Sequence, residues 1–287
     1  MLRLKAYAKV NLVLEVLGRR DDGYHEIASI MQTVGLYDVL TFEAGDEIEF
    51  SCSAPELQAS GNLVWKAVRA LREATGEKRG ARITLEKKIP PAAGLGGGSS
   101  DAAAALKGLN RLWGLGLAAE KLAEIAAGIG SDVPFFIYGG TCLAEGRGEK
   151  ITPLPDIRST WFVLLRPDVA VPVNKTAALY AMLKPEHYSG GGCAGGAAEL
   201  MKKGEAGTGM FYNTFDNVAA EAYNGLEHYR EAFARAGAVG IHIAGSGPLL
   251  FSMFYSREEA LAVQAKLSLI KMDSILAPGV ARDEAGY

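Results

Sequence analysis

The sequence predicts an α+β fold, in which antiparallel strands are interrupted by helices. Short apolar runs such as Trp161–Leu165 recur between turn residues, and segments with helical apolar spacing separate them. Hydrophobic residues also make up 49% of the 287 residues, which is enough to fill one large core or two moderate ones. These observations favour a folded protein over a disordered one.

The first half of the chain alternates predicted strands and helices. Leu2–Leu17 is apolar and β-branched without a helical period, which indicates one or two strands. Asn62 is a typical N-cap, and the apolar stripe behind it ends before Gly76, so we expect a helix between them. Ala81–Ile89 alternates in its first half and ends at a proline pair, as a strand would. The remaining predicted elements are a strand at Glu47–Cys52 and helices at Asp101–Trp113 and Ala118–Ala127.

The proline-punctuated segment Pro153–Pro155 is the predicted domain boundary, so we expect one domain at 1–155 and a second at 156–287. A G-x-G-x-x-G match at Gly190–Gly195 has no strand before it, and we interpret it as a flexible loop. The predicted elements of the second half are strands at Trp161–Arg166, Val239–Ala244, Leu249–Tyr255 and Ser274–Ala277, and helices at Thr176–Leu183, from the glycine-rich loop to Lys203, Asp216–Ala236 and Arg257–Ile270.

Charge and composition argue against several classes of protein. The formal net charge is -3 and no dense Lys/Arg cluster stands out, so we expect no nucleic acid partner. Three widely spaced cysteines without a C-x-x-C pair argue against a disulfide framework or a zinc site. No apolar run approaches the ~20 residues that span a bilayer, so no membrane is expected. We therefore expect a cytoplasmic protein that is a monomer or a weak homodimer.

The strongest local pattern is a glycine-rich loop between a strand and a helix. Four glycines at positions 94 to 98 remove side chains and let several backbone N–H groups turn toward one anion. Ser99 or Ser100 could cap the following helix and offer its hydroxyl to a phosphate or to its Mg²⁺. The loop is neither a Walker A loop nor a dinucleotide fingerprint, and the alternative is a loose turn before an alanine-rich helix. The predicted triphosphate-binding residues are Pro91, Ala92, Ala93, Gly94, Leu95, Gly96, Gly97, Gly98, Ser99 and Ser100.

This loop resembles the phosphate loop of the GHMP kinases, the superfamily of galactokinase, homoserine kinase and mevalonate kinase. Within it, four further segments are similar to the member that phosphorylates a cytidine-diphosphate-linked sugar alcohol. These segments are Ala6–Leu12, Arg19–Ile27, Gly130–Phe136 and Gly245–Pro248. The resemblance implies a two-domain GHMP kinase fold, with an N-terminal ribosomal-protein-S5-like nucleotide-binding domain and a C-terminal ferredoxin-like α/β sandwich. It also implies ATP and Mg²⁺.

The resemblance assigns the chemistry to two charged residues. It makes Asp132 the base that takes the proton of the acceptor hydroxyl and Lys9 its cationic partner, as phosphoryl transfer requires. Without the resemblance, the alternative is that Asp132 is an ordinary surface aspartate and Lys9 an ordinary lysine at the end of a strand. Asn11 lies on the same side of a strand as Lys9 and could bind the acceptor or orient Asp132. Asn62 opens a helix that in this family lies near the adenine.

The resemblance also implies how the acceptor is recognised. Tyr24 stacks on cytosine, His25 reads its polar edge, and Tyr180 supplies the opposite face. The alternative to these binding roles is that each ring only packs against other parts of the protein. Gly245 and Ser246 lie in a tight turn close to the phosphate and the acceptor. No metal ligand is predicted.

Two other functions remain open at this point. One is another GHMP kinase, such as homoserine or mevalonate kinase, whose acceptors have no base for Tyr24 to stack on. The other is a catalytically silent nucleotide-binding regulator, which would be expected to lose Lys9 or Asp132.

Overall fold

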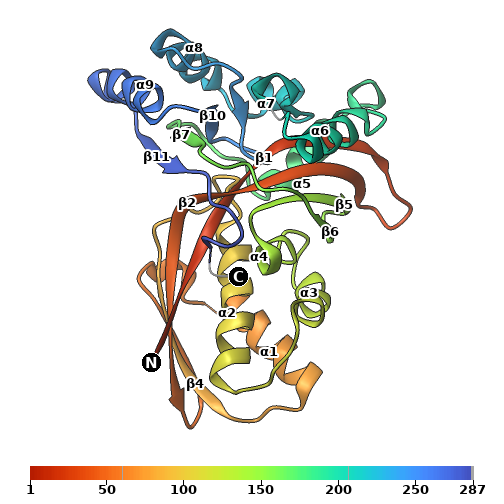
Figure 1. The fold of residues 1–287 in the computed structure, drawn as a ribbon, viewed down its shortest axis with the longest axis vertical. Helices are drawn as coiled ribbons and strands as arrows, with labels where there is room; N and C mark the ends of the chain where they lie inside the picture. Colours follow the sequence, from red (N-terminus) through yellow and green to blue (C-terminus); the bar gives the residue numbers. More distant parts are fainter. Residues whose placement is uncertain (60, 206, 286–287) are drawn as a thin grey trace.

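The computed structural model describes residues 1–59, 61–205 and 207–285 and has the expected α+β architecture (Figure 1). It contains a seven-stranded sheet, built mainly from the first half of the chain, and a four-stranded sheet from the second half. In the described part of the chain, no helix is long and apolar enough to cross a membrane.

Two long strands, β1 (Leu2–Arg19) and β2 (His25–Gly45), form the spine of the first sheet. They pair antiparallel along almost their whole length and run from the lower part of the molecule into the upper part (Figure 1). β1 was predicted from the sequence, but β2 was not. Residues 27–34 of β2 are all buried, so this stretch lacks the polar alternation that marks a half-exposed strand.

The lower part of the sheet packs against helices. The strand order is β3-β4-β2-β1-β8, and β5 pairs with both β2 and β6. The alanine-rich face of α2 approaches the sheet closely, and a Cβ at Gly108 would lie 2.4 Å from the Phe42 ring. The elements that follow β2 in the first half of the chain are β3 (Ile48–Cys52), α1 (Leu63–Thr75), β4 (Gly80–Glu86), α2 (Gly97–Leu112), α3 (Ala119–Ala127), α4 (Phe135–Tyr138), β5 (Thr141–Gly146) and β6 (Lys150–Pro153).

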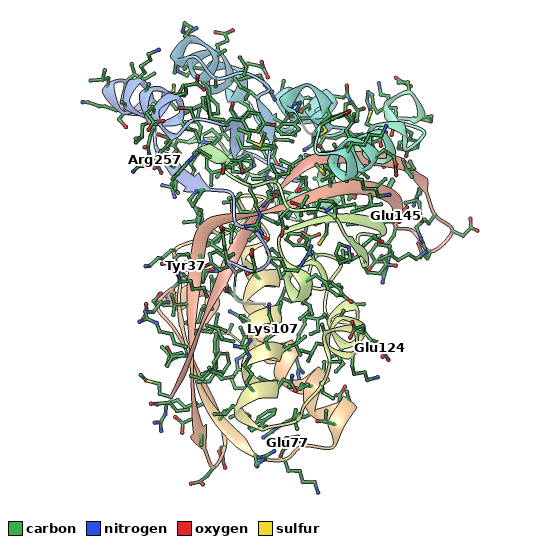
Figure 2. The ribbon with its side chains drawn as sticks, viewed as in Figure 1. Tyr37, Glu77, Lys107, Glu124, Glu145 and Arg257 are labelled. Carbon is green, nitrogen blue, oxygen red and sulfur yellow. The ribbon has the colours of Figure 1, made fainter. Side chains whose placement is uncertain are left out.

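Charged side chains such as Glu124 and Arg257 are exposed, whereas Lys107 of α2 is half-buried (Figure 2). The Lys107 ammonium donates to the carbonyl of Phe136 at 2.7 Å. Burial, together with the charge of Arg111, lowers the pKa of Lys107 well below its usual value.

The second sheet has the order β11-β7-β10-β9 and is covered by helices. Its core joins residues of β7 and β10 to α7, α8 and α9. The elements of this half are β7 (Trp161–Leu165), α5 (Lys175–Met182), α6 (Gly192–Lys203), β8 (Tyr212–Asn213), α7 (Asp216–Ala222), α8 (Leu226–Ala236), β9 (His242–Ile243), β10 (Leu250–Phe254), α9 (Arg257–Leu269) and β11 (Ser274–Pro278).

The two halves share a core and a sheet. β8 comes from the second half but pairs in parallel with β1, and Val34 of β2 forms an isolated bridge with Gly279. A central apolar cluster combines Leu12 and Ile30 with Phe251. The proposed boundary at 155 falls between β6 and β7, and it stays a prediction because these connections cross it.

Three local predictions were wrong. The glycine-rich segment at 190–195 is not all loop, because α6 begins at Gly192, where Ala194 N donates to the Glu15 carboxylate at 2.7 Å. The predicted helix 216–236 is split into α7 and α8 around Gly225, which has a φ of 89°. The predicted strand 239–244 contains only β9.

Candidate active site

A cavity of about 1160 Å³ lies where the two halves meet. Its wall includes the glycine loop, β1, the first turn of α5 and the turn at Gly245. Of the predicted site residues, Ser100 alone does not line it. Those that do are Lys9, Asn11, Tyr24, His25, Asn62, Pro91, Ala92, Ala93, Gly94, Leu95, Gly96, Gly97, Gly98, Ser99, Asp132, Tyr180, Gly245 and Ser246.

The glycine loop has a shape that side chains would prevent. Gly94 has a φ of 89°, and a Cβ there would lie 1.8 Å from the carbonyl oxygen of Ala244. Gly96 has a φ of 71° and is itself the N-cap of α2, so the expectation that Ser99 or Ser100 caps this helix was wrong. Both serines lie inside the first turn, and Ser100 is buried. The first amides of α2 therefore open onto the cavity without a side-chain cap.

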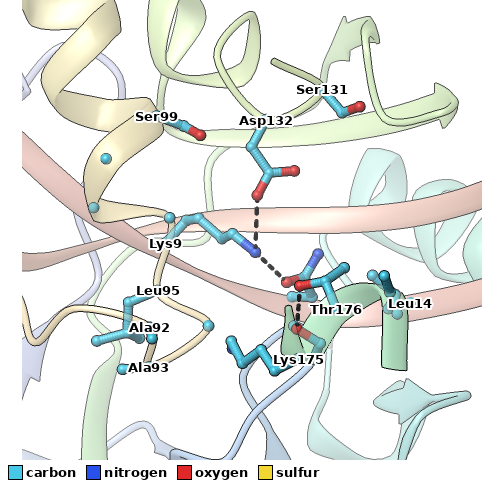
Figure 3. Close-up of a pocket in the computed structure, with 18 of the residues that line it drawn as sticks. Lys9, Leu14, Ala92, Ala93, Leu95, Ser99, Ser131, Asp132, Lys175 and Thr176 are labelled. Carbon is cyan, nitrogen blue, oxygen red and sulfur yellow. Dashed lines mark hydrogen bonds and ion pairs between the residues drawn. The ribbon is translucent and has the colours of Figure 1, made fainter. Parts of the chain in front are cut away.

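Lys9 and Asp132 meet beside this loop. Lys9 Nζ lies 3.4 Å from Asp132 Oδ2, and the lysine side chain is 4% exposed. In Figure 3, Asp132 lies on one side of the Lys9 ammonium and Lys175 and Thr176 lie on the other. The backbone N–H of Lys9 donates to Leu95 O at 3.0 Å, which ties β1 directly to the loop.

Asn11 orients Lys9 rather than Asp132. Its Oδ1 accepts from Lys9 Nζ at 2.6 Å, and its Nδ2 donates to Ser29 Oγ at 2.8 Å. Ser29 in turn donates to the carbonyl of Val13 at 2.7 Å. This buried chain of hydrogen bonds fixes the amide orientation of Asn11 and holds the ammonium toward Asp132.

The turn at Gly245 approaches the same ammonium from the second half. A Cβ at Gly245 would lie 3.2 Å from Lys9 Nζ, so glycine allows this close approach. Asn213 of β8 holds the turn by donating to Gly245 O at 2.8 Å, and Tyr223 donates to Ser246 O at 2.5 Å. Ser246 Oγ is also 3.0 Å from Thr176 Oγ1.

Aromatic rings that contact one another line one part of the cavity wall, here called its aromatic end. The side chain of Tyr24 is about half exposed, and the Arg147 guanidinium lies 4.8 Å from its ring centre. His25 stacks on Tyr180 with ring centres 4.4 Å apart and planes at 15°. The predicted cytosine sandwich is thus not an open slot, because His25 covers one face of Tyr180. Burial, with a contribution from Arg19, lowers the pKa of His25 and favours the neutral imidazole.

Asn62 caps α1 as expected, since its Oδ1 accepts from Val64 N at 2.9 Å. Leu57 and Leu63 line the cavity beside it. The two leucines form an apolar corner of the cavity wall beside the start of α1.

A second charged cluster lies beside the first turn of α2. Lys87 Nζ is 2.5 Å from Asp38 Oδ2 and 2.8 Å from Asp101 Oδ2. Burial raises the pKa of Asp101 to about 7, and the charge of Asp38 adds to this while Lys87 opposes it. Burial opposes the charge on Lys87, yet the two carboxylates together raise the pKa of its ammonium.

Several residues that face the cavity or support its wall were not predicted from the sequence. Lys175 and Arg147 line the wall, and Asn213 anchors the Gly245 turn. Arg147 could have been found from the Glu-Gly-Arg-Gly-Glu hairpin, where an arginine is presented at a turn between two strands. Lys175 and Asn213 come from segments with no distinctive pattern in this sequence.

No group of three potential His, Cys, Asp or Glu metal ligands occurs among residues 1–59, 61–205 and 207–285. Mg²⁺ in kinases is held largely by substrate phosphates, waters and one or two protein oxygens, so it needs no such group. The Ser99 side chain is drawn at the start of α2, across the cavity from Ala92 and Ala93 (Figure 3). Its hydroxyl is compatible with this mode of metal binding.

Comparison with known proteins identifies the family. Residues 62–140 match the model of the GHMP kinase N-terminal domain. The 4-diphosphocytidyl-2-C-methyl-D-erythritol kinase of Dehalococcoides mccartyi is 46% identical over 260 residues, which cover 91% of this chain and 92% of that protein. The enzyme of the same name from Thermodesulfovibrio yellowstonii is 38% identical over 263 residues, covering 91% and 92%.

Comparison with solved structures indicates the same family. A crystal structure of 4-(cytidine 5'-diphospho)-2C-methyl-D-erythritol kinase has a TM-score of 0.80 at 31% identity, with 97% of this chain and 100% of that chain covered. Homoserine kinase from Cytophaga hutchinsonii has a TM-score of 0.77 at 20% identity, with coverage of 98% and 95%, and shares the fold. The chain therefore belongs to the 4-diphosphocytidyl-2-C-methyl-D-erythritol kinase family, within the GHMP small-molecule kinases.

Proposed function

We propose that this protein transfers the terminal phosphate of ATP to the 2-hydroxyl of 4-diphosphocytidyl-2-C-methyl-D-erythritol, a step of the non-mevalonate route to isoprenoid precursors. The observation that carries this is the Lys9–Asp132 pair, 3.4 Å apart, beside a loop whose backbone amides open onto one cavity. A paired acid and amine next to an anion-binding loop is the arrangement that phosphoryl transfer needs.

The residues divide the chemistry between them. Asp132 accepts the proton of the acceptor hydroxyl as its oxygen attacks the terminal phosphorus of ATP, and ADP leaves with the bond between the β and γ phosphates broken. Lys9 holds Asp132 in place and faces the charge of the transferring group. The amides at the start of α2 bind the phosphates of ATP. Mg²⁺, when bound, neutralises phosphate charge, and Ser99 offers it a hydroxyl oxygen.

Recognition of the acceptor is assigned to the aromatic end of the cavity. The exposed ring of Tyr24 can stack on cytosine, with Arg147 on its other side. A neutral His25 has one donor and one acceptor nitrogen, which suits the polar edge of a base. Tyr180 can serve as the second ring after His25 moves from its face. The apolar corner beside Asn62 is assigned to the adenine of ATP.

The direct test is release of ADP from ATP with three acceptors supplied in parallel: the cytidine-linked alcohol, homoserine and mevalonate. We expect turnover with the first acceptor alone, and a product phosphorylated at its 2-hydroxyl by phosphorus NMR. Turnover with homoserine or mevalonate instead would assign another GHMP activity. Nucleotide binding without turnover on any acceptor would favour a silent regulator.

A further inference from the structure

Lys175 is a charged residue of this cavity to which the resemblance gives no role. It is the first residue of α5 and follows Asn174, whose φ of 51° turns the chain sharply into the helix. Its side chain is only partly exposed, and its ammonium donates to the carbonyl oxygen of Gly247. Lys175 therefore reaches from α5 to the turn that also approaches Lys9.

The charges around this turn do not balance. The charged groups that face Lys175 are Lys9 from β1 and Asp132 from the loop before α4. Lys9 pairs directly with Asp132, and Lys175 feels the charge of the same carboxylate. Burial, and then repulsion from Lys9, lower the pKa of Lys175 to about 8, against the attraction of Asp132. A partly desolvated excess of positive charge is costly unless an anion joins it.

The ammonium also has donors to spare for such an anion. A lysine ammonium carries three N–H donors, and the bond to Gly247 O uses one of them. Lys175 contacts the Gly245–Gly247 turn through Gly247 O, and the Lys9 ammonium lies close to the same turn, since a Cβ at Gly245 would be 3.2 Å from Lys9 Nζ. Figure 3 shows the Lys175 side chain extending from α5 toward the loop that carries Ala93 and Leu95. Because Lys9, Asp132 and Lys175 line one cavity, an anion bound at this turn can approach both ammonium groups.

We propose that Lys175 is a second phosphate-binding cation of this centre, donating to phosphate oxygens brought beside Lys9 and Asp132. Those oxygens belong either to the terminal phosphate of ATP or to the diphosphate of the acceptor. The inference rests on the proposed function, because that function brings both phosphates to this point. The bond to Gly247 O holds the ammonium in position before either substrate arrives.

The test compares three variants by calorimetric binding. Lys175→Gln keeps a donor for Gly247 O but removes the charge, and Lys175→Arg keeps both. Lys202→Gln is the matched control, because Lys202 is an exposed lysine of α6 that pairs with Glu199. The ligands are CDP, cytidine, ADP and a non-hydrolysable ATP analogue, which separate the acceptor diphosphate from the terminal phosphate of ATP.

We expect Lys175→Gln to weaken one phosphate ligand at least about tenfold, a typical effect of losing one charge-assisted hydrogen bond. Loss for CDP but not for cytidine assigns the contact to the acceptor diphosphate. Loss for the ATP analogue but not for ADP assigns it to the terminal phosphate. Lys175→Arg and Lys202→Gln should bind within a few-fold of wild type. Equal binding of all ligands by Lys175→Gln and wild type would overturn the proposal.

The pH dependence separates charge from a purely structural tether. Because the protonated lysine binds the anion, affinity of the wild type should fall as pH rises from 7 to 9. Lys175→Arg stays charged and should lose this fall, whereas Lys175→Gln should be weak and equally flat. A fall that is the same in Lys175→Gln and in wild type would contradict the proposal.

These binding measurements do not require turnover. If wild type bound the ATP analogue but phosphorylated none of the three acceptors, the proposed function would fail. A weaker affinity of Lys175→Gln for that analogue would still support the cation role.

Discussion

The molecule contains two lysine clusters near the glycine loop, and their charge balance is opposite. The cluster at the Gly245 turn has two lysines, Lys9 and Lys175, around the single carboxylate Asp132. The cluster at the first turn of α2 has one lysine, Lys87, between two carboxylates. The Asp132 side chain is 33% exposed, whereas the Asp38 and Asp101 side chains are 0% and 2% exposed.

The first cluster has an excess of positive charge that a bound anion can neutralise. In the second cluster the lysine is already paired with carboxylates. The lysine pair faces the open cavity, so phosphate can supply the missing negative charge. Lys87 and Asp101 also line the cavity, but this lysine is already paired with two buried carboxylates. Asp38 accepts the backbone N–H groups of Lys88 and Ile89 as well. We infer that the first cluster serves the reaction and the second fixes the start of α2.

The largest effect is expected for Asp132→Asn. The amide cannot take the proton of the acceptor, so kcat should fall by about 10³-fold, within the range for loss of a general base. The affinity for the ATP analogue should change little, because the amides of α2 are untouched. Steady-state kinetics and calorimetry measure the two effects.

Asp132→Glu is the matched variant, since it keeps the carboxylate but displaces it, and it should retain more turnover than the amide. If Asp132→Asn turned over at the wild-type rate, Asp132 would not be the base. The functional distinction between the Asp132 cluster and the Lys87 cluster would then be wrong.

A loss of stability, rather than of turnover, is expected for Asp38→Asn. The amide can still accept from Lys88 N and Ile89 N, but its NH₂ group would then face the Lys87 ammonium. Breaking a buried pair in this way costs about 3 kcal/mol. Urea unfolding should show it, and Asp46→Asn, at an exposed turn, is the control. If the Asp38→Asn protein were as stable as wild type, the Lys87 cluster would not be what fixes the start of α2.

Tyr24→Ala tests a residue outside both clusters. We expect the KM for the acceptor to rise about tenfold, corresponding to about 1.4 kcal/mol for one lost stacking contact, with kcat and the KM for ATP little changed. The variant thus affects binding alone, in contrast to Asp132→Asn. Tyr255→Ala, at another exposed tyrosine, is the control. Equal losses for acceptor and ATP would count against stacking on cytosine.

The parts of the site that sequence could predict are those built within short segments. Gly94 and Gly96 signal a loop without side chains, and Asn62 signals a helix start, because each acts on its own backbone neighbours. Lys9 and Asp132 are far apart in the chain, and their pairing was expected only from resemblance. The Asn11–Ser29 bond depends on the register of β1 and β2, which local pattern does not specify.

The failures have the same origin. β2 is buried along most of its first half, so tertiary packing hides its period. The glycines at 192–196 enter α6 because Glu15, from a distant strand, accepts from Ala194 N. Lys87 was not recognised because its two carboxylates come from β2 and α2. Charge balance is a property of the assembled cavity, and it becomes visible only when the contacts are known.

The smallest effect, and the sharpest test of the comparison, is expected for Asp101→Asn. The Asp101 carboxyl has a pKa raised to about 7 when folded, against about 4 when unfolded. Between these values the folded state holds a proton that the unfolded state has lost, so this group lowers stability as pH rises from 4 to 7. The amide removes that dependence. Relative to wild type, the variant should therefore gain about 1 kcal/mol in free energy of unfolding between pH 6 and pH 7. Urea unfolding at the two pH values measures the gain. A variant that loses stability as pH rises would show that Asp101 is a charged partner of Lys87, and the cluster would then be an ordinary buried ion network.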